Sequence, residues 1–318
     1  MRARLAAVFA WLLLVPGAVR AAGPSVYVAN ERSNDVTIID ASTNTVVGTI
    51  AVGQRPRGMG LSPDGRTLYV ALGIEQAVAA VDVATRKVTS KIPAGSNPEG
   101  LAVSRDGARL YVSNEDAATA SAIDARSGQI VGKIGVGVEP EGVTVSPDGR
   151  LVYVAAESAN TVSVIDTVTL RVVATIPVGS RPRESAFTPD GARAYVSAEI
   201  GGVVSVVDVP SHKVIATVPI DRTVPKPKGV VVHPNGRWVY VANGGANEVA
   251  VIDSERNVVS SFIAVGKRPW GVGITADGRR LYTANGLSDD VSVIDTESRQ
   301  VIATIRVGAR PWGLVVGR

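Results

Sequence analysis

The chain has 318 residues, with 33 lysine and arginine against 29 aspartate and glutamate side chains and no cysteine. The absence of cysteine excludes disulfides, thiolate metal sites and a lipoprotein anchor. The formal charge of +4 comes without a basic run, which gives little reason to expect nucleic acid or an anionic membrane as a partner.

The first residues have the pattern of an export signal. Arg2 and Arg4 precede an apolar run through Leu5 to Val15, and small residues follow. We therefore expect residues 1–21 to be a signal peptide and the mature chain to begin at Ala22. Its removal leaves 30 basic against 29 acidic side chains, a charge of +1. No later segment has the roughly 20 apolar residues of a membrane helix, so no membrane span is expected.

One tyrosine-centred unit recurs along the rest of the chain. The seven tyrosines are Tyr27, Tyr69, Tyr111, Tyr153, Tyr195, Tyr240 and Tyr282. Neighbouring tyrosines are 42 residues apart, except for a step of 45 residues between Tyr195 and Tyr240. A repeat of roughly 40 to 45 residues with four short strands is typical of a propeller blade. Residues 22–318 are therefore predicted to form one seven-bladed β-propeller domain.

The second copy, residues 55–95, serves as the template for the strands of a blade. We place strand A at 58–61, strand B at 67–71, strand C at 77–81 and strand D at 87–92. The strands are apolar on both faces, because each blade packs between two others. Asp64 and Asp82 stand in the turns, and equivalents recur through the copies, so we assign them to turns and not to catalysis.

The two ends of the repeat region complement each other. Residues 25–50 supply only strands B, C and D, whereas residues 310–316 supply a strand A with nothing after it. Pairing Trp312 to Val316 beside Val26 to Asn30 would remove the open edges of the ring. The predicted fold class is all-β, with four-stranded antiparallel blades and a ring closed by the C-terminal strand joining the three N-terminal strands.

Function must come from the positions at which the copies differ. The B-to-C loops and the D-to-A crossovers emerge on one face, called the funnel face below, and each crossover carries a proline to the axis. The residues before the proline are Arg55, Asn97, Glu139, Arg181, Lys226, Arg268 and Arg310. Those after it are Arg57, Glu99, Glu141, Arg183, Lys228, Trp270 and Trp312.

These crossover residues, with asparagine 97 set aside, are the predicted ligand-binding or partner-binding site. Arginine forks suit carboxylate or phosphate, and two tryptophans can stack on a planar ring. Acids come from two adjacent crossovers and cations from the others, so a polarised mouth is expected. The alternative is a solvated rim whose charges pair with one another.

Two departures from the repeat fall on the same face. A glycine follows the motif in six copies, where seven inner strands crowd the axis. The fourth copy has Glu184 instead, a carboxylate that needs a partner such as Arg183, unless a local bulge turns it outward. A three-residue insertion within 219–228 forms either a lip over the funnel or a tolerated surface insertion.

The sequence contains none of the common catalytic motifs, and we assign no catalytic residue or metal ligand. His212 and His233 fall on the face opposite the funnel, which gives histidine-ligated zinc or haem in the funnel little support. No serine-hydrolase elbow, phosphate loop or zinc-protease motif occurs.

Two uses of the funnel carboxylates stay open. Lactone hydrolysis needs only a carboxylate and an arginine, so Glu99, Glu141 and Glu184 are candidates for it. Glu99, Glu139 and Glu141 could gather a hard cation. The interpretation that these acids balance neighbouring arginines is favoured over the cation site.

The repeats resemble a known family. Tyr27-Val28-Ala29-Asn30, Tyr111-Val112-Ser113-Asn114 and Tyr282-Thr283-Ala284-Asn285, with the Ser-Pro-Asp-Gly turns, are similar to the YVTN family of bacterial propellers. Seven copies after a signal peptide, with Arg-Pro-Arg at the first and fourth crossovers and Arg-Pro-Trp at the last two, resemble propellers associated with pyrroloquinoline quinone (PQQ)-dependent catabolism. The resemblance implies a periplasmic, non-catalytic protein whose relatives are encoded beside quinoprotein alcohol dehydrogenases, c-type cytochromes and an ABC transporter.

The leading hypothesis is therefore a monomeric binding or scaffolding propeller that presents its funnel face to a small anionic ligand or a periplasmic protein. PQQ is a candidate ligand, since it is planar and bears carboxylates that match Trp270 and Trp312 beside Arg57, Arg268 and Arg310. No cofactor is firmly expected. The alternatives are a lactonase-like hydrolase and a structural surface-layer repeat protein.

Overall fold

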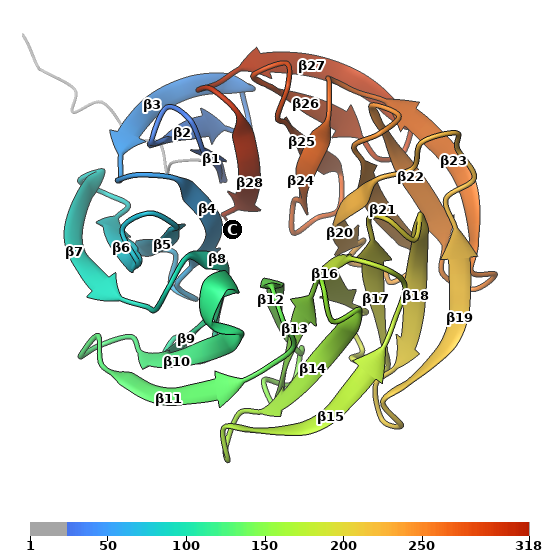
Figure 1. The fold of residues 1–318 in the computed structure, drawn as a ribbon. Coiled ribbons are helices and arrows are strands. Elements are labelled where there is room, and N and C mark those ends of the chain that lie inside the picture. Colours follow the sequence, from blue (N-terminus) through green and yellow to red (C-terminus); the bar gives the residue numbers. More distant parts are fainter. Residues whose placement is uncertain (1–23, 318) are drawn as a thin grey trace, which may run out of the picture.

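The computed structural model describes residues 24–317, so the predicted signal peptide lies outside the described residues. Within that range the chain forms 28 strands and one short 3-10 helix, Glu115–Ala117. The strands make seven four-stranded sheets that stand around one axis as the blades of a ring (Figure 1). The predicted all-β, seven-bladed propeller is confirmed. The described residues contain no helix with the length and apolar character of a membrane span.

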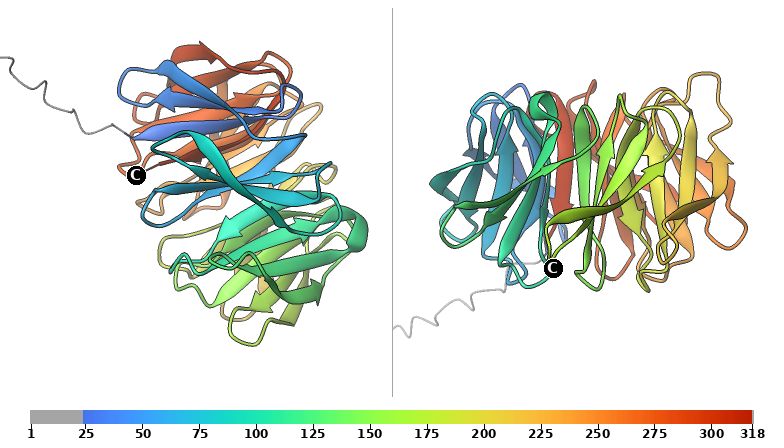
Figure 2. Two further views of the ribbon diagram at one scale, coloured as in Figure 1. Left: turned by 90° about the vertical axis from the view of Figure 1, so that its left-hand side faces the viewer. Right: turned by 60° about the horizontal axis from the view of Figure 1, so that its bottom comes forward.

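The blades follow the chain, with strand A innermost and strand D on the outer rim (Figures 1 and 2). Blade 1 contains β28 (Pro311–Val316), β1 (Ser25–Asn30), β2 (Asp35–Asp40) and β3 (Thr45–Ala51). Blade 2 contains β4 (Pro56–Leu61), β5 (Thr67–Leu72), β6 (Ala77–Asp82) and β7 (Lys87–Pro93). Blade 3 contains β8 (Pro98–Val103), β9 (Arg109–Asn114), β10 (Thr119–Asp124) and β11 (Ile130–Gly135).

The other four blades repeat the order. Blade 4 contains β12 (Pro140–Val145), β13 (Leu151–Ala156), β14 (Thr161–Asp166) and β15 (Arg171–Pro177). Blade 5 contains β16 (Pro182–Phe187), β17 (Arg193–Ala198), β18 (Val203–Asp208) and β19 (Lys213–Pro219). Blade 6 contains β20 (Pro227–Val232), β21 (Trp238–Asn243), β22 (Glu248–Asp253) and β23 (Val258–Ala264). Blade 7 contains β24 (Pro269–Ile274), β25 (Arg280–Asn285), β26 (Asp290–Asp295) and β27 (Gln300–Arg306).

The predicted ring closure is also confirmed. Strand β28 pairs antiparallel with β1, and Val316 lies opposite Val26 while Gly313 lies opposite Ala29. Figure 1 shows β28, in red, beside the blue strands of blade 1. The two ends of the chain therefore share one sheet, which removes the free inner edge that an open ring would expose.

The inner strands begin earlier than the sequence pattern suggested. Strand β4 starts at Pro56, which pairs with Leu72, and the register then shifts before Met59 pairs with Val70. Similar shifts occur in the other inner strands. A bulge lets the chain turn from the crossover into the strand while the proline, which has no N–H to donate, occupies the first position.

The core lies between blades. In one cluster, Val204 and Val206 of blade 5 pack with Val239 and Val241 of blade 6, and all four are fully buried. Strands B and C are buried on both faces for this reason, as the unbroken apolar pattern predicts. The repeat tyrosines are also buried there, with exposures of 8 % or less.

The axial glycines and the turn aspartates have their predicted roles. A Cβ on Gly100 would stand 2.0 Å from the carbonyl oxygen of Glu141, because adjacent inner strands touch through their backbones. Asp82 Oδ1 accepts the backbone N–H of Thr85 at 2.7 Å, and Asp64 Oδ1 accepts that of Arg66 at 3.1 Å. Every turn of these two kinds that carries an aspartate is held by the same type of bond, so the aspartate series is structural.

Candidate functional site

Two sets of loops are tied together on the funnel face. The residue after each strand B donates its N–H to the carbonyl of the residue before an axial proline, as Gly73 does to Arg55 at 3.0 Å and Glu199 to Arg181 at 2.8 Å. Six of the seven residues before the proline adopt left-handed backbone, with φ between 53° and 58°. These residues are not glycine, so the strained conformation is held by the surrounding loops. The candidate side chains are therefore presented from a rigid frame.

The first group of funnel charges surrounds Arg57. Its guanidinium lies 2.9 Å from Glu99 and 2.7 Å from Glu31. Arg55 reaches the same two carboxylates, at 3.0 and 3.5 Å. The Glu99 side chain is only 2 % exposed. These charges pair with one another as one prediction had it, but they do so in a buried cluster and not on a solvated rim.

The second group surrounds Arg183. Its Nε lies 2.8 Å from Glu141 Oε2, its Nη1 contacts Glu157, and the same Nη1 lies 3.4 Å from Glu199. Lys228 Nζ stands 3.0 Å from Glu141 Oε1. The Arg183 side chain is 10 % exposed and that of Lys228 is 6 % exposed. Since burial strips these ions of water, each one depends on its partners in the cluster.

The electrostatics of this group set the protonation of two carboxyls. Burial by itself would raise the pKa of Glu141, but Arg183 and Lys228 outweigh it and hold that pKa well below its usual range. Glu157 hydrogen bonds to Glu141, and burial together with this negative neighbour raises the pKa of Glu157 to about 8. The direct contact between these two carboxyls therefore moves their pKa values in opposite directions.

Glu184 lines a small cavity on the axis with Glu141, Arg183, Lys228 and Trp312. The expected partner Arg183 forms its ion pairs with other carboxylates, and Glu184 has no ion-pair partner among the described residues. Burial raises the pKa of Glu184 to about 7, against the opposing attraction of Lys228. The bulge expected to turn Glu184 outward exists, but the side chain faces the axis.

The axial cavity has a volume of about 70 Å³. A water molecule needs about 10 to 15 Å³ of cavity volume, so the cavity fits a few waters. Pockets for small organic ligands are usually about 300 to 1,000 Å³. The cavity is therefore too small for a planar quinone or a sugar lactone.

The two tryptophans differ in accessibility. Trp312 is 8 % exposed, and Lys228 Nζ lies 3.6 Å from the centre of its ring, with Arg57 at 5.0 Å. Trp270 is half-buried, and Arg268 and Arg310 lie 5.3 and 5.2 Å from its ring centre. Arginine and lysine side chains of the protein thus lie over the tryptophan rings on which a ligand was expected to stack. Trp312 is therefore not free to stack on a ligand.

The insertion within 219–228 packs against residues of blade 6 on the funnel face. Arg222 is 2.8 Å from Glu248 and stands 3.4 Å over the Phe262 ring. A Cβ on Gly245 would fall 1.8 Å from the carbonyl oxygen of Val224. The insertion therefore lies against the B-to-C loop of blade 6, anchored at the outer side of that blade.

The carboxylates proposed for a hard cation are engaged elsewhere. Glu99 and Glu141 hold arginine and lysine partners, and Glu139 accepts a hydrogen bond from Ser158. Across residues 24–317 no group of three or more acidic, histidine or cysteine side chains is placed to hold a metal ion. Glu99 and Glu141 thus balance cations, as that interpretation has it, whereas the contact of Glu139 is with a hydroxyl group.

The sequence analysis missed Glu31, Glu157 and Glu199, which supply four of the eight ion pairs described above for the groups around Arg57 and Arg183. All three stand four residues after a repeat tyrosine, at the start of the B-to-C loop. Aligning the copies at that position would have found them. Their presence beside the arginines also means that the crossovers alone do not define the polarity of the mouth.

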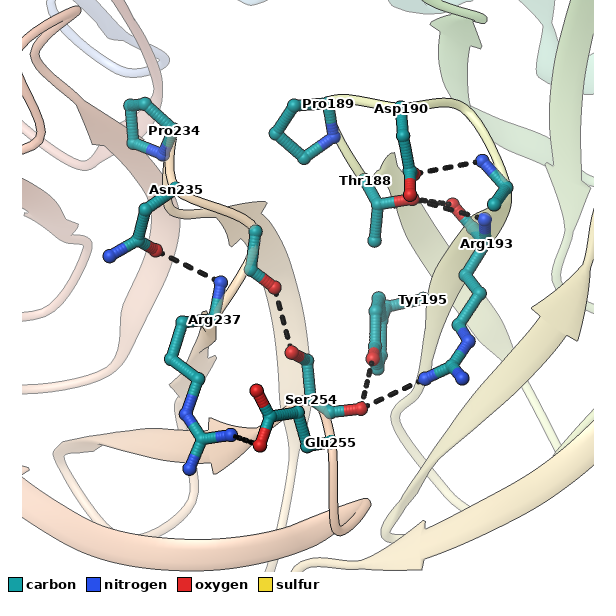
Figure 3. A pocket seen from close by; sticks show the side chains of 12 residues that line it. Thr188, Pro189, Asp190, Arg193, Tyr195, Pro234, Asn235, Arg237, Ser254 and Glu255 are labelled. Atoms are coloured by element: carbon teal, nitrogen blue, oxygen red, sulfur yellow. Dashed lines mark hydrogen bonds and ion pairs between the residues drawn. The ribbon is translucent and has the colours of Figure 1, made fainter.

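The opposite face carries a larger hollow, of about 540 Å³, between blades 5 and 6 (Figure 3). Arg193 donates to the carbonyl of Ser254 at 2.9 Å, and Arg237 pairs with Asp253 at 2.7 Å and with Glu255. Figure 3 shows the two arginines on opposite sides of the hollow. None of the predicted site residues lines it.

Comparison with known families agrees with the fold. A family model described as a lactonase, seven-bladed β-propeller, matches residues 166–302, and one for YNCE-like β-propellers matches residues 66–146. A PE-PGRS family protein of Mycobacterium tuberculosis is 49 % identical over 41 residues, which cover 13 % of this chain and 9 % of that relative. The curated match is thus one repeat long. The chain is a seven-bladed β-propeller.

Solved structures show the same architecture. Hydrazine synthase from Kuenenia stuttgartiensis is 24 % identical over 90 % of this chain and 99 % of that chain, with a TM-score of 0.79. A provisionally assigned 6-phosphogluconolactonase from Bacteroides uniformis is 18 % identical over 93 % and 100 %, with a TM-score of 0.80. Dihydro-heme d1 dehydrogenase NirN is 19 % identical over 96 % and 78 %, with a TM-score of 0.69. At these identities the likeness is one of fold.

Proposed function

We propose that the protein is an exported, periplasmic and non-catalytic propeller that binds a protein partner across its funnel face. In this proposal it acts as a monomer, accessory to PQQ-dependent alcohol oxidation and an associated ABC transport system. The observation that carries the binding role is the funnel itself. The clusters around Arg57 and Arg183 pair their charges internally, and the axial cavity beside them measures about 70 Å³.

A surface of this kind suits a macromolecule better than a small ligand. A small ligand gains affinity when a pocket surrounds most of its area, whereas a protein partner binds across a broad and mostly preformed surface. The funnel face supplies such a surface, because its loops are joined by backbone bonds and buried ion pairs. PQQ thus fits the proposal better as the cofactor of a partner than as a ligand of the axial cavity.

The export and PQQ parts have separate support. The first 21 residues match the pattern of a signal peptide, and the Arg-Pro-Arg and Arg-Pro-Trp crossovers resemble those of the PQQ-associated propellers. They are tested by fractionating cells that produce the full chain. We expect a periplasmic product that begins at Ala22, and cytoplasmic protein that retains Met1 would contradict export.

A lactonase-like hydrolase is the second candidate. The family model over residues 166–302 and the structural likeness to a provisionally assigned 6-phosphogluconolactonase favour it. The opposite pKa shifts of Glu141 and Glu157 beside Arg183 also resemble those of an acid and base pair. Both carboxyls are 5 % exposed or less, however, so a lactone would have to displace the ion cluster to reach them.

One experiment separates the two functions. Purified protein 22–318 is assayed for hydrolysis of 6-phosphogluconolactone and gluconolactone, and for a change in melting temperature with PQQ. We expect no hydrolysis above the buffer rate and no change with PQQ. Lactone turnover that disappears in Glu141→Gln would refute the non-catalytic proposal.

The binding role is tested by cross-linking in the envelope fraction of the producing cells. Wild-type protein is compared with Trp270→Ala on the funnel face and Arg66→Ala on the opposite face. We expect one cross-linked species that is weakened by Trp270→Ala and unaffected by Arg66→Ala. Equal cross-linking of all three proteins would refute binding through the funnel face.

A further inference from the structure

One repeat position divides the funnel face into two sectors. Four residues after each tyrosine the chain has Glu31, Gly73, Glu115, Glu157, Glu199, Gly244 and Gly286. Where this residue is Glu31, Glu157 or Glu199, it pairs with crossover arginines, as Glu31 does with Arg57 at 2.7 Å. Blades 6 and 7 are consecutive in the ring, and both have glycine there. Their loops contribute no carboxylate at this position.

The cations of that sector are correspondingly short of partners. Lys226 has no ion pair among the described residues, although its backbone N–H is bound by Asn243. Arg268 reaches only Glu199, at 3.4 Å, and Arg310 reaches only Glu31, at 3.3 Å. The Nε atom of Arg268 is buried and has no hydrogen-bond acceptor among the described residues. An unpaired buried donor costs free energy, which an incoming acceptor would recover.

The same glycines bring apolar groups to these cations. A Cβ on Gly286 would stand 2.8 Å from the Trp270 ring, so the glycine makes room for the indole. Leu287, the next residue, is 59 % exposed, and Val224 of the insertion is 53 % exposed. Tryptophan and arginine are among the residues that contribute most to protein–protein binding energy, and the exposed aliphatic side chains beside them add apolar contact area.

We propose that this sector, made of Lys226, Arg268, Trp270, Arg310, Leu287 and Val224, is the docking site for an acidic segment of a protein partner. The inference rests on the proposed function and specifies its contact surface. Carboxylates of the partner pair with the cations of this sector, where Gly244 and Gly286 supply no acid, and apolar side chains of the partner pack on Leu287 and Trp270. Trp270 is not among the residues that line the axial cavity, and Leu287 and Val224 are exposed, so the site lies on the surface, where a segment of chain can reach it.

The test uses protein 22–318 and a fluorescein-labelled octaglutamate peptide, with binding followed by fluorescence anisotropy. Wild-type protein is expected to bind, and binding should weaken as salt rises from about 50 to about 200 mM because exposed charges are screened. Lys226→Gln should weaken binding about fivefold and Gly244→Glu about tenfold, since the latter restores the acid found in other copies. Octalysine should not bind.

Matched controls keep the test specific. Gly73→Glu makes the same change at the equivalent position of blade 2, where the atoms nearest to the added Cβ belong to the flexible side chains of Arg55 and Asn97. Arg66→Gln removes a cation from the opposite face. Both controls should alter binding less than about twofold. Circular dichroism of Gly244→Glu checks its fold, and Lys226→Gln tests the same sector without adding a side chain.

The outcomes distinguish this inference from the proposed function. Equal weakening by Gly244→Glu and Gly73→Glu would show binding outside the sector and overturn the inference. Tight binding of free PQQ that competes fully with the peptide would overturn the proposal that a protein segment occupies this site. Absence of octaglutamate binding, with partner cross-linking still lost in Trp270→Ala, would overturn the acidic segment and leave the proposed function standing.

Discussion

Replacing Arg183 by methionine should destabilise the propeller by roughly 3 to 5 kcal/mol, because it leaves buried carboxylates without their shared cation. Arg183 lies 2.8 Å from Glu141, contacts Glu157, and is 10 % exposed. Lys228 and Arg181 stay in place but each faces one side of the cluster. Methionine keeps most of the side-chain volume, so the measured loss reports charge more than packing.

Thermal unfolding of protein 22–318 provides the measurement. For a chain of this length roughly 2 °C of melting temperature corresponds to 1 kcal/mol, so the expected decrease is roughly 6 to 10 °C. Arg66→Met is the matched control. Its side chain is 86 % exposed and 4.0 Å from Asp64, so the expected change is below about 1 °C.

The difference in melting temperature between wild type and Arg183→Met should depend on pH, which gives a second readout. In the wild type the pKa of Glu141 is held low, so its stabilising contribution is present above the ordinary glutamate pKa and is lost only as pH falls through the lowered value. Without Arg183 this pKa rises, and protonation relieves the buried charge. The gap between variant and wild type should therefore shrink from about pH 8 to about pH 5. A decrease equal to that of Arg66→Met, or a gap that widens in acid, would refute the reasoning.

Three further results are expected. The pKa of Glu184 is raised to about 7, so the folded wild type holds an extra proton above the ordinary pKa of about 4.3 and loses stability as pH rises between the two values. At about pH 8 the Glu184→Gln variant should therefore melt roughly 2 to 6 °C higher than the wild type. An unchanged dependence of the melting temperature on pH would contradict this. Gly100→Ala should cost roughly 2 to 4 kcal/mol, because its Cβ meets the Glu141 carbonyl oxygen at 2.0 Å. Gly135→Ala, whose Cβ meets nothing within 4 Å, is its control, and equal melting temperatures of the two variants would count against axial crowding. Deletion of residues 310–318 removes β28 and should give an insoluble or oligomeric product by size-exclusion chromatography; a soluble monomer with unchanged melting would disprove the closure.

The strands, turns and closure could be predicted from the sequence because they depend on patterns repeated many times. Tyr27 and its six equivalents mark the same place in strand B of every blade, and each turn aspartate binds backbone within three residues of itself. Such contacts are local or identical from copy to copy. The start of β4 at Pro56 was missed because a proline that begins a bulged strand looks like a loop residue.

The site was only partly predictable. The crossover side chains were identified because their positions could be read from one motif, but their partners lie far away in sequence, as Glu157 does from Arg181 by 24 residues and Glu141 from Arg183 by 42. Pairing across the funnel depends on which loops the ring brings together. No local pattern encodes that Trp312 lies under Lys228 while Trp270 stays half-buried.

The sequence by itself determined the all-β class, the seven blades, the shared first blade and the face on which the copies differ. It could do so because a period of about 42 residues copies one set of local interactions around a ring. Only the tertiary structure decided that the funnel charges form a buried, mutually paired cluster and that the axis holds a cavity of about 70 Å³. Those properties depend on burial and on distances between loops from different blades, and both arise only when the ring has closed.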